Sequence, residues 1–381
     1  MSIRGKASIA GVYEHPDRVI KDRSVAQIHA DVFAGVLADA GMSRSDVDGF
    51  FSDGRLSPLS LIEYLGLRVR HVDSTTIGGS SNIAHIGHAA EAIASGKCSV
   101  ALVTLAGKPR SQVRGEFHAD VPESAFEDVY GTSTAGIYAL AAQRHMYEFG
   151  TTSRQLAEIK VAASHHAQYN PNAFLRRKIT VEDVLDSPMV SDPLHRLDCC
   201  VITDGGGAIL VVSPEVAREI ERPSVTVLGQ AEHVRHTSGG RLDVTTTGAA
   251  WTGPRAFAEA GISTADVRYA GIYDSFTITV LETIEDLGFC EKGKGGAFVS
   301  DGALLAPYGA LPVNTDGGGL CNNHPNNQGG LTKVVEAVRQ LRGEAAPEVQ
   351  VPNCDIAIAH GTGGRIGTRM GSVTLVLGAA T

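Results

Sequence analysis

No apolar run in the sequence approaches the roughly 20 residues that a membrane-spanning helix needs, so we expect no membrane span. Lysine and arginine occur in no run longer than a few residues, and the formal net charge is −9, which argues against nucleic acid as a partner. The N-terminal residues lack the cationic and then apolar pattern of a secretory signal.

Cysteine is scarce and scattered. The six residues are Cys98, Cys199, Cys200, Cys290, Cys321 and Cys354. Their spacing matches no metal-ligand pattern, since even the adjacent pair does not make a zinc site, and we expect no metal. Scattered, reduced thiols are typical of the cell interior, so the sequence predicts a cytoplasmic protein.

Glycine, by contrast, is abundant. The 44 glycines among 381 residues exceed the ordinary share, which is about 7%, and they cluster in loops rather than repeat. Flexible linkers explain this pattern poorly, and close approach of the backbone to another group explains it better. With 43% hydrophobic and 20% charged residues, the chain suits one large globular unit or two intimately packed halves.

Strand-like and helix-like patterns alternate along the chain, which predicts an α/β architecture. The expected strands are 7–13, 47–51, 72–76, 99–104, 208–213 and 355–359, and the expected helices are 25–40, 58–65, 81–94, 136–149, 153–170, 277–287 and one that starts at 328. A longer and more polar segment, from about 107 to 204, looks like an insertion into a layered core. The expected domains are therefore residues 1–222, with this insertion, and residues 223–381.

A short repeat connects the two halves. The heptapeptide GMSRSDV at 41–47 matches GISTADV at 261–267, and each follows an alanine-rich helix pattern and precedes an apolar strand pattern. Capping chemistry alone can make helix–turn–strand joints converge on such a sequence. Seven aligned positions with similar flanks favour a duplication, and a duplicated unit fixes a fold more tightly than local propensity does.

The run NTDGGGLCNNHPNNQGG, residues 314–330, carries His324 in its middle. Pro325 disfavours helical backbone angles at His324, so we expect the imidazole to project from a loop. A histidine on a glycine-rich loop just before a helix is a common way to present a base beside an anion-binding pocket. The alternative is a structural loop with a capping histidine, and the run by itself leaves both interpretations open.

A strand–turn–helix joint at 76–82 is a second place for chemistry. Its residues Gly79, Ser80 and Ser81 stand at the start of a helix pattern rich in small residues. Such joints hold the nucleophile in acyl-transfer enzymes, but serines at a helix start are most often N-caps. No neighbouring base for a serine nucleophile can be identified.

Two more loops follow apolar strands, where α/β folds gather site residues. Asp274 is either a helix cap or a site residue, and the neighbouring Tyr273 is interpreted as a site residue. In the later loop, His360 is a second acid/base or a structural histidine, while Gly363 and Gly364 could offer N–H donors to an oxyanion.

Together these motifs resemble the thiolase superfamily, specifically the sterol-carrier-protein-x type of thiolases and lipid-transfer-like proteins. The resemblance covers essentially the whole chain, and its most specific segments are DVLDSPMVSDPLHRLDCCVITDGGGA (183–208), YDSF with the later EDLGF (273–289), NTDGGGLCNNHP and the terminal HGTGG. It implies a duplicated α/β/α/β/α core, an inserted loop domain over the active site, a homodimer, and coenzyme A thioesters as substrates, with no covalently bound cofactor.

The resemblance also implies site residues. His324 matches the histidine of the family's Gly-His-Pro motif, which lines an oxyanion site, although Asn323 replaces the glycine. Tyr273 replaces the first residue of the Asn-Glu-Ala-Phe box, and His360 matches the acid/base cysteine of the final Cys-x-Gly-Gly loop. The expected catalytic residues are His324, Tyr273, Asp274 and His360, and the expected backbone groups at the oxyanion are those of Gly318, Gly363 and Gly364.

The largest departure from the family is at the nucleophile. The family's Cys-x-Ser-Gly motif aligns with Gly79-Ser80-Ser81-Asn82, which holds no cysteine. A thiol is partly ionised near pH 7 and a serine is not, so ordinary thiolysis is not expected. Relatives that lack this cysteine include aldolases that remove steroid side chains as acyl-CoA thioesters. They are similar to this chain at Tyr273, often require a small OB-fold/zinc-ribbon partner, and carry a second tyrosine in place of His324.

We therefore expect an enzyme that changes a carbon–carbon bond of an acyl-CoA thioester, of retro-aldol type. Two alternatives stay open. One is an acyltransferase of unusual mechanism, with Ser80 or Ser81 as an ester-forming nucleophile or with direct condensation of bound acyl groups. The other is a non-catalytic acyl-CoA or lipid-binding protein. The insertion holds no aromatic cluster or charge pattern that identifies the acyl chain.

Overall fold

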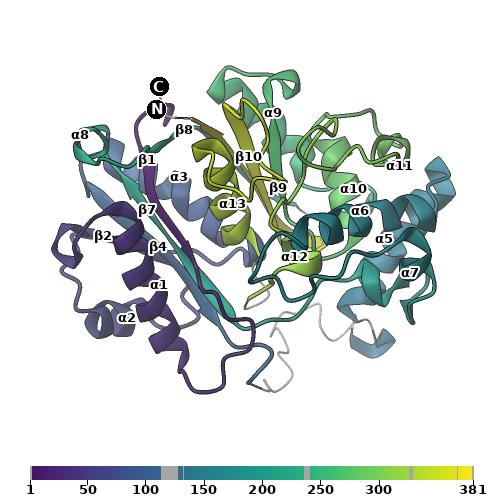
Figure 1. The fold of residues 1–381 in the computed structure, drawn as a ribbon, viewed down its shortest axis with the longest axis horizontal. Coiled ribbons are helices and arrows are strands. Elements are labelled where there is room, and N and C mark those ends of the chain that lie inside the picture. The colour runs from purple at the N-terminus through teal and green to yellow at the C-terminus, as the bar shows by residue number, and fades with distance from the viewer. Residues whose placement is uncertain are drawn as a thin grey trace.

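The computed structural model describes residues 2–112, 128–131, 133–235, 241–325, 329–366 and 368–379. Across these ranges the chain forms a nine-stranded mixed sheet, in the order β3-β2-β4-β7-β1-β8-β11-β10-β9, and a two-stranded sheet, β5-β6 (Figure 1). The strands are β1 (Ser8–Glu14), β2 (Gly49–Ser52), β3 (His71–Ser74), β4 (Val100–Gly107), β5 (Met189–Ser191), β6 (Leu194–His195), β7 (Gly205–Val212), β8 (Val225–Arg235), β9 (Tyr269–Ile272), β10 (Ile356–Arg365) and β11 (Thr368–Gly378). The helices are α1 (Val25–Ala40), α2 (Pro58–Leu65), α3 (Ser81–Ala94), α5 (Thr134–Phe149), α6 (Ser153–Ala167), α7 (Val181–Leu185), α8 (Pro214–Glu219), α9 (Ala249–Ala260), α10 (Thr277–Asp286), α11 (Gly295–Phe298), α12 (Gly318–Cys321) and α13 (Gly330–Arg342).

The large sheet is built twice around its centre. There β1 and β8 pair antiparallel at two positions, Ser8 with Thr226 and Ile9 with Val225. Outward from this pair, each half has two antiparallel pairings and then a parallel one, through β7, β4 and β2 on one side and β11, β10 and β9 on the other. From this mirrored order we propose that the chain divides into two halves near residue 222.

The repeated heptapeptide forms the same joint in both halves. Gly41 ends α1 with φ of 65°, and Gly261 ends α9 with φ of 66°, a left-handed conformation that glycine adopts without strain. After each glycine, a serine and an aspartate three residues later make a reciprocal capping box before the next strand. Capping chemistry thus explains the residues of the repeat, while the mirrored strand order extends well beyond them.

Helices cover both faces of each half of the sheet. One apolar cluster joins α3 and α13 to strands of both halves, so these two helices form the middle layer. A second cluster packs α1 and α2 on the N-terminal half, and a third packs α9 and α10 on the C-terminal half (Figure 1). The α/β class and the α/β/α/β/α core expected from the resemblance are confirmed.

The predicted insertion lies between β4 and β7 and contributes α5, α6, α7 and the β5-β6 hairpin. Its residues 113–127 and 132 lie outside the described ranges. Helix α6 packs against α10 and α12, which belong to the C-terminal half. The insertion therefore crosses to the other half of the molecule. In the part of the chain that the structure describes, none of the helices is both long and apolar enough to cross a membrane.

His88 on α3 joins the edge strand β3 to the central strand β8. Its Nδ1 lies 2.7 Å from Asp73 and its Nε2 lies 2.9 Å from Glu232. The hydrogen bond with Glu232 and the nearby carboxylate charges raise the pKa of His88 to about 9, against the ordinary 6.5. The imidazolium is therefore the form that the folded protein favours near pH 7.

We expect His88→Asn to lower the free energy of unfolding by roughly 1–2 kcal/mol at about pH 6. A raised folded-state pKa contributes stability that is complete below the unfolded value of 6.5 and is lost as the pH rises through about 9. The difference from the wild type should therefore shrink towards zero near pH 10. Urea unfolding at a series of pH values measures it, and a difference that stays constant with pH would contradict this reading.

Candidate active site

A cavity of about 590 Å³ lies where the four loops singled out in the sequence meet. The backbone around Gly78 and Gly79, the residues after β9, the His324 loop and the end of β10 all reach it. Helix α5 of the insertion supplies a further wall. The lining residues are Arg55, Gly78, Gly79, Thr134, Ala135, Tyr138, Val190, Cys199, Cys200, Ile202, Tyr273, Ser275, Phe276, His324, Thr362, Gly363 and Gly364.

Tyr273 and His324 meet at the cavity wall. The Tyr273 hydroxyl lies 2.7 Å from Nε2 of His324, with the rings edge to face and their centroids 5.4 Å apart. Hydrogen bonds from their own backbone N–H groups hold both residues in place. The Tyr273 N–H donates to the His360 carbonyl at 2.9 Å, and the His324 N–H donates to Thr203 Oγ1 at 2.9 Å. Burial raises the pKa of Tyr273 well above 10. The tyrosine is therefore a neutral phenol whose proton can pass to the imidazole.

The ring of Tyr273 occupies the space beside position 79. A Cβ atom built on Gly79 would overlap the Tyr273 ring and the Thr362 carbonyl oxygen. Gly78, with φ of 64°, packs as closely against Gly363 and Gly364. A side chain at position 79 and this placement of Tyr273 therefore exclude one another. The close approach of backbone that the many glycines indicated is found here.

Ser80 and Ser81 follow directly but do not present their hydroxyls to the cavity. Both are fully buried, and neither is among the described residues that line it. The Ser80 hydroxyl donates to the Ile77 carbonyl at 2.8 Å, and the Ser81 hydroxyl donates to the Gly78 carbonyl at 2.7 Å. These contacts fix the turn before α3. From these contacts we propose the structural role for the two serines, which is one of the two roles that the sequence leaves open.

Asp274 points away from the cavity, in contrast to Tyr273. Its carboxylate accepts the N–H groups of Gly319 at 2.8 Å and Leu320 at 3.1 Å, at the start of α12. It also lies 2.6 Å from the Lys333 ammonium, with both side chains 1% exposed. The expected role as a catalytic base is not supported, because its oxygen atoms are committed to these buried contacts.

Gly318, expected at the oxyanion, also lies away from the cavity lining. Its N–H donates to Asp316 Oδ1 at 2.9 Å, and its φ is 60°. A Cβ on Gly318 would overlap Asp274 Oδ2. The glycine is therefore needed for the approach of Asp274 to α12, and its N–H is not free for a substrate.

The segment around His360 was expected as a loop, and it is a strand. Strand β10 continues to Arg365 and pairs with β11, from His360 with Thr374 to Gly363 with Gly371. The His360 side chain is fully buried and contacts Thr374 Oγ1 at 2.8 Å, and burial lowers the pKa of His360 to about 3. We therefore propose that His360 is a neutral structural histidine, in place of the acid/base role that the sequence predicts. Gly363 and Gly364 do reach the cavity, and they stay the predicted backbone donors.

Several lining residues could not be found from the sequence. Tyr138 of the insertion stacks on Phe276 with ring centroids 4.4 Å apart. Cys199 and Cys200 also line the cavity, but burial raises their pKa values to about 11 and about 12. Both are therefore protonated thiols near pH 7, and neither replaces the missing nucleophile. The only signal for them was their place in the segment LDCCVITDGGGA.

The comparisons with known proteins show the family of this chain. The family model described as "Thiolase C-terminal domain-like" matches residues 229–379. A steroid side-chain-cleaving aldolase of Thermomonospora curvata is 33% identical over 380 residues, which is 94% of this chain and 96% of that protein. An acetyl-CoA acetyltransferase of Methanothermobacter thermautotrophicus is 32% identical over 382 residues, which is 95% of this chain and 97% of that one.

A solved structure is similar across the whole fold. The structure named "Ltp2-ChsH2(DUF35) aldolase" superposes with a TM-score of 0.91 and 31% identity, over 100% of this chain and 99% of that one. A human mitochondrial 3-ketoacyl-CoA thiolase, at 13% identity and a TM-score of 0.72, shares the fold.

Proposed function

We propose, from the premise that this chain belongs to the thiolase superfamily, that it is an acyl-CoA aldolase. It breaks or forms the bond between the α and β carbons of a β-hydroxyacyl-CoA without a covalent acyl-enzyme. The observation that carries this proposal is the position of Tyr273. Its ring fills the space that a nucleophile at position 79 would need, and its hydroxyl bonds to His324.

In the cleavage direction, the β-hydroxyl of the substrate gives its proton to the Tyr273 oxygen while the Tyr273 hydroxyl passes its own proton to Nε2 of His324. The bond between the α and β carbons then breaks. The β carbon becomes a ketone or aldehyde, and the electron pair becomes the enolate of the thioester. Backbone N–H groups at Gly363 and Gly364 hold the enolate oxygen. The proton on His324 returns through Tyr273 to the α carbon, which completes a shorter acyl-CoA and restores the site.

The cavity favours a bulky apolar acyl group. The stacked rings of Tyr138 and Phe276 form one wall, and Val190 and Ile202 add apolar surface. A volume of about 590 Å³ is ample for a ring system beside the reacting carbons. The similar aldolase is named for steroid side chains, and we propose a substrate of this apolar class.

The proposed assembly has two kinds of partner. Strand β3 is an edge strand of the large sheet, and Val72 on it is 42% exposed, which supports a homodimer through this edge. The similar structure named Ltp2-ChsH2(DUF35) pairs an aldolase with a second protein, which supports a small OB-fold/zinc-ribbon partner. A cytoplasmic location stays a proposal from the six free cysteines.

An acyltransferase is the second candidate, because a relative of similar identity carries that name. It would proceed through an acyl-enzyme on a serine, since the cavity thiols are protonated, or by direct condensation of bound acyl groups. We expect the intact mass of the protein to show no adduct after incubation with acyl-CoA. Ser80→Ala should keep the cleavage activity, because its hydroxyl only fixes the turn before α3. An acylated peptide that contains Ser80, together with loss of activity in Ser80→Ala, would favour transfer.

A further inference from the structure

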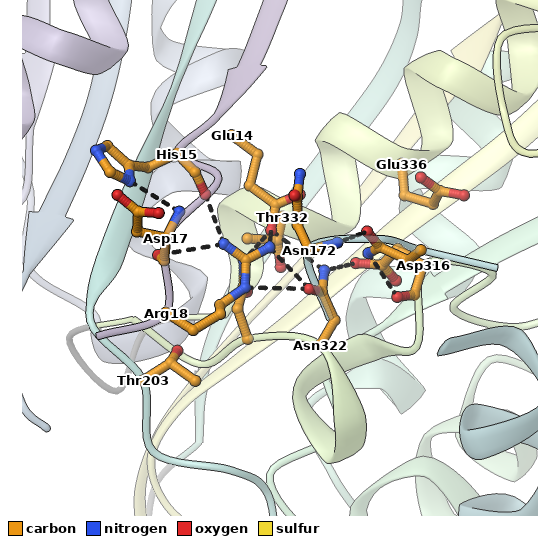
Figure 2. Close-up of polar contacts among 12 residues, drawn as sticks. Glu14, His15, Asp17, Arg18, Asn172, Thr203, Asp316, Asn322, Thr332 and Glu336 are labelled. Atoms are coloured by element: carbon orange, nitrogen blue, oxygen red, sulfur yellow. Dashed lines mark hydrogen bonds and ion pairs between the residues drawn. The ribbon is translucent and has the colours of Figure 1, made fainter. Parts of the chain in front are cut away.

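We infer that Glu14 and Arg18, at the end of β1 and in the segment that follows it, are positioning residues for His324. They hold Asn322 and Asn323, the two residues directly before His324, from the other half of the molecule. The kinetic part of this inference rests on the proposed function, whereas the geometric part does not. Figure 2 shows the polar contacts that carry it.

We call the contacts of Glu14 and Arg18 with Asn322 and Asn323 the clamp. The Arg18 guanidinium is its centre, and Arg18 is only 7% exposed. Its Nε and Nη2 donate to Asn322 Oδ1 at 3.2 and 2.8 Å, and Nη2 also donates to Glu14 Oε1 at 2.7 Å (Figure 2). Its Nη1 donates to the His15 carbonyl at 2.5 Å. The fork of the guanidinium therefore ties the chain just after β1 to a single side chain of the His324 loop.

The side-chain amide groups of the loop complete the clamp. Asn322 Nδ2 donates to Glu14 Oε1 at 3.2 Å and to Asp316 Oδ2 at 2.8 Å. Asn323 Nδ2 donates to the same oxygen of Glu14. The oxygen and the nitrogen of the Asn322 side-chain amide thus both bond to charged groups. Hydrogen bonds to charged groups are stronger than those between neutral groups.

Catalysis needs the placement that this clamp provides. The backbone of His324 is held by Thr203 Oγ1 on one side and by the clamped pair Asn322 and Asn323 on the other. The Tyr273 hydroxyl lies 2.7 Å from Nε2 of His324, and this hydrogen bond is kept only if the imidazole stays within a fraction of an ångström of its position. Misplacement of a catalytic group by about 1 Å can cost about 100-fold in rate.

The alternative is that the clamp merely holds the two halves together. The chain offers a matched control in Arg342 of α13, whose side chain is 1% exposed. It lies 3.2 Å from Asp39 and donates to the carbonyls of Ala10 and Pro223 at 2.7 and 2.8 Å. Arg342 also joins the two halves, but it does not touch the residues before His324.

The test compares Arg18→Lys with Arg342→Lys, because lysine keeps the charge and loses the fork. We expect Arg18→Lys to lower kcat by about 10- to 100-fold, with little change in KM. Arg342→Lys should lose a comparable amount of thermal stability while its kcat stays near the wild-type value. Equal kcat values at equal loss of stability would overturn the inference.

A second readout separates this inference from the proposed function. In ¹⁵N-histidine NMR spectra of the full chain, the His324 ring resonances, assigned with His324→Gln, should move in Arg18→Lys and not in Arg342→Lys. If the wild type cleaves no substrate, the proposed function fails and this readout still decides the inference. Unchanged His324 resonances in Arg18→Lys would overturn it. Should Arg18→Lys not fold, Glu14→Gln takes its place, with a smaller shift expected because the amide keeps one acceptor.

Discussion

Replacing Tyr273 with phenylalanine is expected to lower kcat for carbon–carbon cleavage by roughly 10²- to 10⁴-fold. The variant keeps the ring beside Gly79 and removes only the hydroxyl that links the substrate to His324. Binding of acyl-CoA should change little, because the apolar lining is retained. Steady-state kinetics and calorimetric titration with a non-cleavable acyl-CoA measure the two effects separately.

Tyr269→Phe is the matched control for this variant. Tyr269 is fully buried in β9, four residues before Tyr273, and is not among the described residues around the cavity. The Tyr269→Phe variant also loses one buried phenol hydroxyl, but this hydroxyl lies outside the proposed site. The kcat of this variant should therefore stay near the wild-type value. Similar losses in both variants would show that the effect of Tyr273→Phe is structural and would contradict the proton relay.

Replacing Lys333 with methionine is expected to lower the free energy of unfolding by about 3–5 kcal/mol. Lys333 and Asp274 form an ion pair at 2.6 Å, with both side chains 1% exposed. Methionine fills a similar volume but leaves the Asp274 carboxylate buried with two backbone donors among the described residues. Urea unfolding measures the loss.

The double variant Lys333→Met with Asp274→Asn separates charge from packing. Neutralising the aspartate removes the uncompensated charge, so at least about 1 kcal/mol of the loss should return. Its kcat, corrected for the folded fraction, should stay within about tenfold of the wild type if Asp274 only orients α12. A loss as deep as that of Tyr273→Phe would restore Asp274 as a catalytic base.

Much of the fold could be predicted where local chemistry decides. The predicted bounds of α1, α2 and α3 agree with the structure, and α1 and α2 end at Gly41 and Gly66, which take up left-handed caps. The strand that carries HGTGG was predicted too short, because glycine has a low strand propensity. Its pairing with β11 overrides that propensity, and the lack of side chains lets Gly361 and Gly363 pack against the turn before α3.

The loops that form the site could be predicted, but the direction of each side chain could not. The sequence and the resemblance placed Tyr273 and His324 in one pocket, and the structure brings them together across 51 residues of chain. They could not show that Asp274 turns towards Lys333, because that contact depends on how α13 packs against β9. The contact of Arg18 with Asn322 could not be predicted, because nothing in the segment around Arg18 indicates a partner 304 residues away.

The stoichiometry of coenzyme A tests the central claim most directly. A β-hydroxyacyl-CoA with a bulky apolar acyl group is incubated with the protein and the proposed OB-fold partner, with no free coenzyme A, and the products are quantified by mass spectrometry. Retro-aldol cleavage predicts one ketone or aldehyde and one shorter acyl-CoA for each substrate consumed, with free coenzyme A at background. If the β-hydroxyacyl-CoA is not cleaved, while the corresponding β-ketoacyl-CoA is split into two acyl-CoA thioesters only when coenzyme A is added and consumes one equivalent of it, the reaction is thiolysis and the role assigned to Tyr273 and His324 is contradicted.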